Sequence, residues 1–180
     1  VGLAKGNGKT VCSELAILNH WRQNKGRIVY IQPCQRIIDK LYKIWNKKFA
    51  FVSEDKVINK LTGDRTEDFS LVSSSHLILS TPEQFEALSR RWRQRKAIRS
   101  IELIIADDSH IIGNGIQGVA YEALLTRMRF ISDQAQMELR IIALSSPLSN
   151  ARDFGEWIGC EKLNIFNFNP SYRVSPIEEI

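Results

Sequence analysis

The stretch "IIADDSH" (residues 104–110) is an apolar run that ends abruptly in two carboxylates, a serine and a histidine. Near the start of the chain, "KGNGKT" (5–10) combines two glycines with a lysine and a threonine. A buried strand that ends in an aspartate, together with a glycine-rich loop before a helix, is typical of proteins that bind nucleotide phosphates. The two segments therefore predict an α/β fold, and they raise the question of whether the site hydrolyses nucleotide.

The remaining sequence alternates between strand-like and helix-like segments. Four near-continuous apolar runs end in small, polar or proline residues, over 27–33, 76–82, 102–108 and 140–146. Helical patterns cover 9–23, 35–49, 83–96, 118–135 and 150–158. In the first helix, Val11, Leu15, Leu18 and Trp21 fall roughly on one face, and "NKG" (24–26) supplies a stop. This alternation predicts a mostly parallel sheet with helices on both faces and with ligands at the carboxyl ends of the strands.

Length and composition narrow the class of protein. The 180 residues suit one domain, and the formal net charge of +5 fits a polyanionic partner. No apolar run approaches the roughly 20 residues of a membrane helix, so we expect no contact with a membrane. Cys12, Cys34 and Cys160 are odd in number and lack metal-ligand spacing, so we expect buried or neutral thiols and not a disulfide or a zinc site.

The glycine-rich loop is the first candidate site, and its residues are Gly6, Asn7, Gly8, Lys9 and Thr10. Glycines let backbone N–H groups turn around a phosphate, and the helix N-terminus adds a favourable dipole. In such a loop Lys9 would reach the β- and γ-phosphates and the Thr10 hydroxyl would hold Mg²⁺. The strict pattern has glycine where Leu3 stands, but the shorter G-x-G-K-T core is present. The loop predicts ATP and Mg²⁺ as cofactors; the alternative is a glycine-rich turn that caps a helix.

The two aspartates form the second candidate site. Asp107 ends a buried strand, where a carboxylate would hold Mg²⁺ directly or through water. Asp108 stands where active enzymes keep a glutamate that orients and deprotonates the attacking water. Aspartate reaches about 1 Å less far, and misplacement on that scale can cost ~100-fold in rate. Two solvated aspartates at a strand end are the alternative, and His110 is the one histidine that lies beside them.

Several segments together resemble a known family, the superfamily-two RNA helicases. "ADDSH" (106–110) resembles the D-E-x-H box, and "VYIQP" (29–33) resembles the motif after the second strand. "LTGD" (61–64) and "STPEQF" (80–85) resemble two RNA-contacting motifs, and "LSSPLSN" (144–150) resembles the Ser-Ala-Thr coupling motif. The resemblance implies RNA contacts at Thr62, Gly63, Thr81 and Pro82, and a coupling motif at Ser145, Ser146 and Pro147. For Thr81 and Pro82 a simple loop cap is the alternative.

Within that family the resemblance narrows to the large two-cassette spliceosomal DExH-box helicases. "SRRWRQRK" (89–96) and "NARDFGEW" (150–157) are its most specific segments, and they are similar to the first RecA-like lobe of the degenerate C-terminal cassette. The resemblance implies a RecA-like P-loop NTPase lobe over 1–165, with a first strand upstream of residue 1. It also implies that residues 166–180 form a linker toward a second RecA-like lobe. The implied partners are this second lobe, an N-terminal cassette of the same protein and spliceosomal proteins, and the implied location is the nucleus. Contact with RNA is left open.

Three positions depart from the pattern of active members. Lys5 stands in place of a threonine, Asp108 in place of the glutamate, and Ser146-Pro147 in place of Ala-Thr, where the proline removes a backbone N–H. We therefore expect a lobe that binds nucleotide, hydrolyses it weakly or not at all, regulates an active cassette and docks proteins. The alternative is a working ATP-driven translocase with Asp108 as the base. A third class, a P-loop kinase or another small NTPase, is less favoured, because such enzymes do not need the "STPE" and "SSP" segments at these places.

A basic stretch over 89–99 has three interpretations. It could track phosphates and stack on a base, since six of its residues are Lys or Arg and one is Trp92. It could instead be a solvated amphipathic helix with Leu88, Trp92 and Ile98 turned to the core, or a protein-docking face. Glu122, Arg127 and Arg129 have spacings that permit an ion pair within one helix, so we expect these three residues to be structural.

Overall fold

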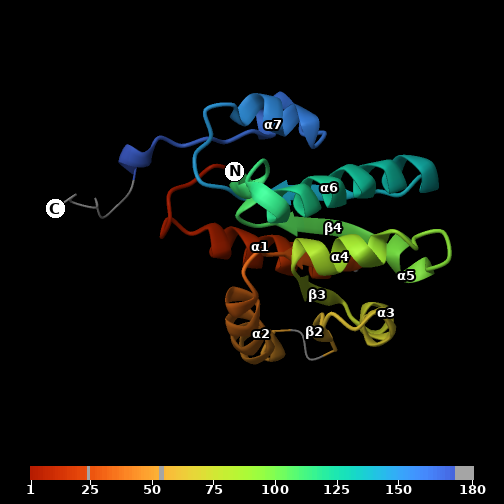
Figure 1. Ribbon diagram of the computed structural model, residues 1–180. Helices are drawn as coiled ribbons and strands as arrows, with labels where there is room; N and C mark the ends of the chain where they lie inside the picture. Colours follow the sequence, from red (N-terminus) through yellow and green to blue (C-terminus); the bar gives the residue numbers. More distant parts are fainter. Residues whose placement is uncertain (24, 53–54, 173–180) are drawn as a thin grey trace.

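The computed structural model describes residues 1–23, 25–52 and 55–172. Its five strands form one sheet in the order β2-β3-β1-β4-β5, and every neighbouring pair is parallel (Figure 1). The strands are β1 (Arg27–Ile31), β2 (Ile58–Lys60), β3 (Leu77–Ser80), β4 (Ile101–Ala106) and β5 (Arg140–Ala143). This architecture confirms the expected α/β class with a parallel sheet.

Helices cover both faces of the sheet (Figure 1). They are α1 (Lys9–Arg22), α2 (Gln35–Ala50), α3 (Arg65–Ser74), α4 (Pro82–Ser89), α5 (Lys96–Arg99), α6 (Gly115–Ala135) and α7 (Ala151–Trp157). Short 3₁₀ turns follow β4 and α7, over Ser109–Ile111 and Lys162–Asn164, and a third covers Pro170–Tyr172. No helix among the described residues is long and apolar enough to cross a membrane.

The strands form because their side chains alternate between two cores. In β1, Val29 and Ile31 belong to the core beneath α3, α4 and α6, whereas Ile28 and Tyr30 belong to the core beneath α1 and α2. All four side chains have no exposed surface. Full burial of each aliphatic side chain contributes about 1.5–3 kcal/mol, so an unbroken apolar run is stable here and would be unfavourable at a solvated face.

The structure contains two elements that the sequence patterns do not predict, and it divides one predicted helix. β2 has three residues and α3 is rich in serine, so neither has a long apolar pattern. The helix expected over 83–96 ends at Ser89 and resumes as α5. The intervening turn lets Trp92 reach the edge of Phe130 while Ile98 is fully buried in the same core.

The face that α1 buries also differs from the prediction. Val11 and Leu15 are 54% and 62% exposed, and Leu18 is only partly buried. The helix buries Glu14 instead, because its carboxylate accepts a hydrogen bond from the Trp45 Nε1 at 2.9 Å and pairs with Lys48 on α2. Glu14, with its charge paired, is thus buried on the face of α1 where the apolar pattern predicted Val11 and Leu15.

Two segments far apart in the sequence meet beside β5. Gly2 forms parallel bridges with Ser145 on one side and with Asn167 on the other. The Gly2 amide donates to the Phe166 carbonyl at 2.7 Å, and the Phe168 amide donates to the Gly2 carbonyl at 3.0 Å. The linker expected over 166–180 stays a prediction, and its part from 173 to 180 lies outside the described residues. Cys12 and Cys34 are free and exposed, so for these two thiols the buried alternative of the expectation is wrong, while the neutral alternative stays a prediction.

Candidate nucleotide-binding site

The glycine-rich loop wraps the N-terminus of α1, as its sequence predicts. Gly6 and Gly8 have φ angles of 86° and 90°, in the left-handed region that favours glycine. A Cβ atom at either position would have no heavy atom within 4 Å, so the backbone conformation and not crowding requires glycine here. Gly8 is the N-cap of α1, and no side chain caps the helix. The loop therefore leaves backbone N–H groups of the first turn directed outward, where an anion can accept from them.

Lys9 and Thr10 follow the loop at the first turn of α1. The Lys9 Nζ donates to the Leu3 carbonyl at 2.8 Å, so the ammonium lies over the loop. Thr10 is exposed at the same end of the helix. An ammonium and outward N–H groups are the hydrogen-bond donors that a nucleotide polyphosphate requires, and a hydroxyl oxygen is a suitable ligand for Mg²⁺. The residues present therefore fit both cofactors.

Asp107 follows β4 directly and is 7% exposed. Its Oδ2 accepts hydrogen bonds from the Tyr30 hydroxyl at 2.5 Å and from the Gln32 Nε2 at 3.2 Å, and its Oδ1 accepts from the Asp108 amide at 2.9 Å. The Tyr121 hydroxyl donates to the Asp107 carbonyl at 2.7 Å. These contacts fix the carboxylate in one orientation at the end of the strand.

Burial raises the pKa of Asp107 above its ordinary value, the charge of Asp108 adds to that effect, and the hydrogen bond from Tyr30 offsets part of it. Burial and the charge of Asp107 also raise the pKa of Tyr30 well above its ordinary value. Tyr30 therefore keeps its proton at neutral pH and acts only as a donor toward Asp107.

Asp108 lies in the left-handed region, with φ 50° and ψ 35°. Aspartate and asparagine tolerate this conformation better than most residues with a side chain. The Asp108 Oδ2 accepts from the Gln32 Nε2 at 3.1 Å, so one amide group bridges the two carboxylates. Gln32 thus holds the Asp108 side chain close to Asp107.

The segment after β5 joins the other two parts of the site. The Leu3 amide donates to the Ser145 carbonyl at 2.9 Å, and the Ser109 amide donates to the Leu144 carbonyl at 3.0 Å. The Ser146 amide donates to the His110 Nδ1 at 3.3 Å. The expected coupling motif, Ser145, Ser146 and Pro147, therefore contacts Leu3, which leads into the glycine-rich loop, and the turn after Asp108; its coupling role stays a prediction.

The nucleic-acid candidates lie at the neighbouring strand ends, after β2 and β3. The amides of Thr62 and Gly63 donate to the buried Asp68 carboxylate at 2.7 and 3.0 Å. Thr81 is the N-cap of α4, forms a capping box with Gln84, and is followed by the buried Pro82. Helix capping therefore accounts for the Thr81 hydroxyl, while Thr62 and Gly63 stay exposed at this edge.

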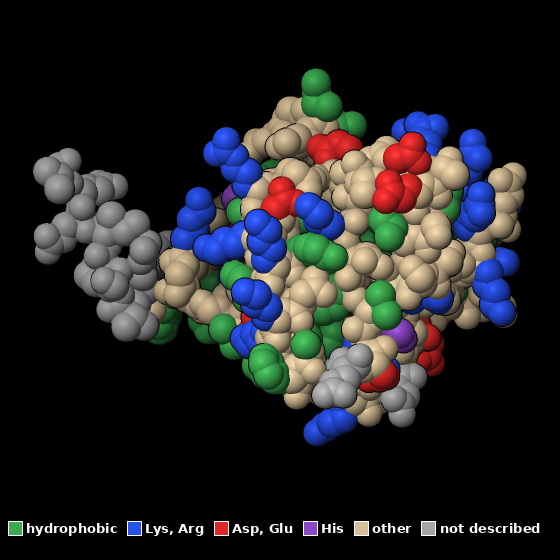
Figure 2. Space-filling model, turned by 90° about the horizontal axis from the view of Figure 1, so that it is seen from below, with side chains coloured by type: hydrophobic (Ala, Val, Ile, Leu, Met, Phe, Trp, Pro, Cys, Tyr) green, Lys and Arg blue, Asp and Glu red, His purple; other side chains and the backbone are tan. Residues whose placement is uncertain are grey.

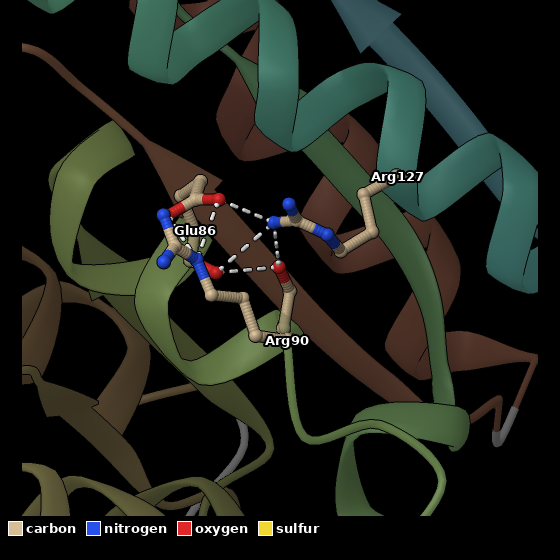
Figure 3. Close-up of polar contacts among 4 residues, drawn as sticks. Glu86, Arg90 and Arg127 are labelled. Carbon is tan, nitrogen blue, oxygen red and sulfur yellow. Dashed lines mark hydrogen bonds and ion pairs between the residues drawn. The ribbon is translucent and has the colours of Figure 1, made fainter.

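Some side chains of the basic stretch and of α6 have structural roles, in ion pairs or in the core. Figure 3 shows Arg90 and Arg127 converging from α4 and α6 on the Glu86 carboxylate, with Nε and Nη1 distances of 3.0 and 2.5 Å. The ion pair expected within α6 is therefore wrong, but both arginines are structural as expected: Arg127 pairs with Glu86 of α4, and Arg129 donates to the Trp157 carbonyl. Leu88 and Ile98 are buried and Trp92 is packed against the core, as the amphipathic interpretation expected.

Three residues of the site were not identified from the sequence: Tyr30, Gln32 and Tyr121. Tyr30 and Gln32 lie in "VYIQP", which the sequence relates to a helicase motif as a whole and not to these two side chains, and Tyr121 lies within the helix expected over 118–135. Tyr121 is in the core, yet its hydroxyl serves the Asp107 carbonyl. Tyr30 and Tyr121 could have been found from the sequence, because each places a hydroxyl group in a predicted apolar strand or helix, and a buried hydroxyl needs a hydrogen-bond partner.

A parallel sheet with a glycine-rich loop at one helix N-terminus and an aspartate at the end of a neighbouring strand defines a RecA-like nucleotide-binding lobe. The model of the DEAD/DEAH box helicase family matches residues 1–154, and the chain belongs to this family.

The similar proteins are long, and the chain matches one part of each. It is 42% identical over 178 residues to the pre-mRNA-splicing factor brr2 of Schizosaccharomyces pombe. It is 44% identical over 179 residues to the U5 small nuclear ribonucleoprotein 200 kDa helicase of Mus musculus. It is also 42% identical over 174 residues to the activating signal cointegrator 1 complex subunit 3-like protein of Dictyostelium discoideum. The alignments cover 96–99% of this chain but 8% of each relative.

Proposed function

We propose that this chain is the nucleotide-binding lobe of an RNA helicase cassette that acts in pre-mRNA splicing. In this proposal the lobe binds ATP with Mg²⁺, hydrolyses it weakly or not at all, and serves to regulate an active cassette and to dock protein partners in the nucleus. The observation that carries the proposal is the hydrogen-bonded union of three segments: residues 3–10, which include the glycine-rich loop, the Asp107–His110 turn and the Ser145–Pro147 segment.

Retained ATP binding is supported by the loop. The N–H groups at the start of α1 and the Lys9 ammonium would hold the phosphates, and Thr10 and Asp107 would hold Mg²⁺, with Asp107 acting through water because its oxygens already accept hydrogen bonds. Bound Mg²⁺ would supply charge neutralisation at the phosphates.

Weak hydrolysis is supported by the geometry of Asp108. Its side chain is one methylene shorter than that of the usual glutamate, and the Gln32 amide holds it beside Asp107. The base is thus kept short of the position in which it would deprotonate an attacking water, and about 1 Å of misplacement can cost ~100-fold. Pro147 adds to the effect, since it provides no N–H in the coupling motif.

The place in splicing is supported by the names of the similar proteins, two of which are a splicing factor and a U5 ribonucleoprotein helicase. The Dictyostelium relative carries a different name at a similar identity. Spliceosomal proteins and a second RecA-like lobe are therefore proposed partners, and RNA would meet the exposed edge at Thr62 and Gly63.

The test is RNA-stimulated ATP hydrolysis by the intact two-lobed cassette, with Asp108 and with Asp108→Glu. We expect little turnover with Asp108 and a rise of about tenfold or more with glutamate. Nucleotide binding, measured by calorimetry, should be preserved in both and lost in Lys9→Ala. Thermal unfolding of each variant provides the control, because the left-handed backbone at residue 108 suits glutamate less well.

Turnover typical of helicases with Asp108 in place would contradict the proposal and would make Asp108 a working base. A silent cassette that Asp108→Glu does not rescue would assign the loss to Lys5 and Pro147 as well. Absence of nucleotide binding in the unaltered cassette would overturn the proposal altogether.

A further inference from the structure

A groove lies between α3 and the turn that joins α4 to α5, away from the proposed nucleotide site. It has a volume of about 510 Å³, and one face of α3 forms its floor. Its charged lining residues are Arg65 on α3 and Arg91 and Arg95 on the turn. Thr66, Ser70 and Ser73 add hydroxyl groups. Figure 2 shows Lys and Arg side chains along the right-hand edge, the side on which these elements lie in Figure 1.

The three arginines have no acidic partner in the part of the chain that the structure describes. The ion pairs found there leave Arg65, Arg91 and Arg95 out, whereas the adjacent Arg90 is paired with Glu86. The acidic side chains at the start of α3 have other partners: Asp64 caps the helix, Glu67 accepts from the Thr62 hydroxyl, and Asp68 accepts from the Thr62 and Gly63 amides. The groove therefore gathers positive charge that no ion pair among residues 1–23, 25–52 and 55–172 neutralises.

The groove is better suited to a phosphate group on a protein than to RNA. Guanidinium groups and hydroxyls bind a phosphate monoester through several charge-assisted hydrogen bonds. Single-stranded RNA also needs exposed aromatic rings on which bases stack. The one ring that lines the groove, Phe69, is 8% exposed and is covered by the Arg95 guanidinium, 4.4 Å from its centroid. The ring of Trp92, on the turn between α4 and α5, is covered by the Arg93 guanidinium.

We propose that this groove binds a phosphorylated serine or threonine in an acidic segment of a partner protein, with Arg65 and Arg91 as the principal ligands of the phosphate. Arg95 completes the positive field while it packs on Phe69. Recognition of phosphorylated segments by clustered arginines is a general mode of peptide binding. The proposal is independent of nucleotide binding, because the groove shares no residue with the glycine-rich loop or with Asp107.

The test uses the full-length protein that contains this lobe. A fluorescent peptide library with a fixed central phosphoserine and randomised flanks is compared with the same library carrying serine, and with a 20-nucleotide oligouridylate. We expect the phosphorylated library to bind more tightly, and the double variant Arg65→Ala/Arg91→Ala to lose about tenfold or more of that difference. Arg93→Ala is the matched control, since Arg93 lies outside the groove on the same turn.

Three results would overturn the proposal. The first is equal binding of the phosphorylated and unphosphorylated libraries. The second is an equal loss in the Arg93→Ala control. The third is oligouridylate binding that depends on Arg65 and Arg91 while phosphopeptide binding does not, which would assign the groove to RNA. Both substituted arginines are exposed and without ion pairs among the described residues, so thermal unfolding should be unchanged in the variants.

Discussion

At the scale of single residues, the site depends on how one buried carboxylate is kept in place. Asp107 accepts from Tyr30, Gln32 and the Asp108 amide, and two of these three donors come from β1 and the residues that follow it. A buried charge is tolerated only where such donors replace water. Tyr30 is therefore a positioning residue for the carboxylate that would hold Mg²⁺.

Removal of the Tyr30 hydroxyl tests this role. Tyr30→Phe keeps the ring, which packs edge-on against Trp45, but leaves Asp107 with one donor fewer. We expect the free energy of unfolding to fall by about 1–3 kcal/mol at neutral pH, because a buried acceptor loses a partner. Urea denaturation measures the change, and Tyr172→Phe, at a side chain that is 70% exposed, is the control. An unchanged unfolding free energy would mean that water replaces the hydroxyl.

At the scale of elements, α6 packs its first turns against the loop that carries the site. A Cβ atom added at Gly118 would lie 2.6 Å from the Ile111 carbonyl oxygen and 2.9 Å from the Gly113 nitrogen. Both neighbours are backbone atoms and cannot turn aside as a side chain would. The close approach sets the position of the 3₁₀ turn, and with it of His110, relative to α6.

Gly118→Ala should therefore act against the usual trend. Alanine normally stabilises a helix interior by about 0.5–1 kcal/mol relative to glycine. Here we expect a loss of about 1–3 kcal/mol, because the new methyl group pushes on backbone. Thermal or urea unfolding measures the sign, and Val119→Ala, one residue further on and 66% exposed, should change little. A stabilised Gly118→Ala variant would show that the turn shifts without cost.

The contact between α4 and α6 should make stability depend on pH. Burial by itself would raise the pKa of Glu86, but the hydrogen bonds and charges of Arg90 and Arg127 outweigh it, and the pKa is lowered (Figure 3). A carboxyl group whose pKa is lowered by folding stabilises the fold at pH values above its pKa in the unfolded state. This contribution is lost as the pH falls through the lowered pKa of the folded state.

We therefore expect Glu86→Gln to be less stable than the original chain by about 1–3 kcal/mol at pH 7. The difference should begin to shrink as pH falls below about 4.5 and should continue to shrink through the lowered pKa of Glu86. Unfolding curves measured from pH 3 to pH 7 give this profile. Glu83→Gln, on the same helix and in none of the ion pairs of the described residues, is the control. A difference that is constant with pH would exclude the charge of Glu86 as its source.

At the scale of the whole molecule, the sequence alone predicts those elements that follow a simple local pattern. Strands buried on both faces have continuous apolar runs, so four of the five strands and the parallel class could be predicted, as could the position of the glycine-rich loop before α1 and of Asp107 at the end of β4. The patterns missed β2 and α3, because neither has an apolar period of useful length. They also misplaced the buried face of α1, where the paired Glu14 replaces an apolar contact. Tyr30, Gln32 and the pairing of Arg127 with Glu86 depend on contacts across the fold that no local pattern contains.

The bridges of Gly2 also have a mechanical consequence. Residues 1–3 and 166–168 run side by side in the same direction, with hydrogen bonds on both sides of Gly2. A force that pulls these two segments toward opposite ends of the chain loads those bonds in shear, so that they must break together and not one after another. The loop that would hold the nucleotide begins directly after this junction. Tension arriving through either segment would thus be borne by the hydrogen bonds of residues 1–3 before it could distort the loop.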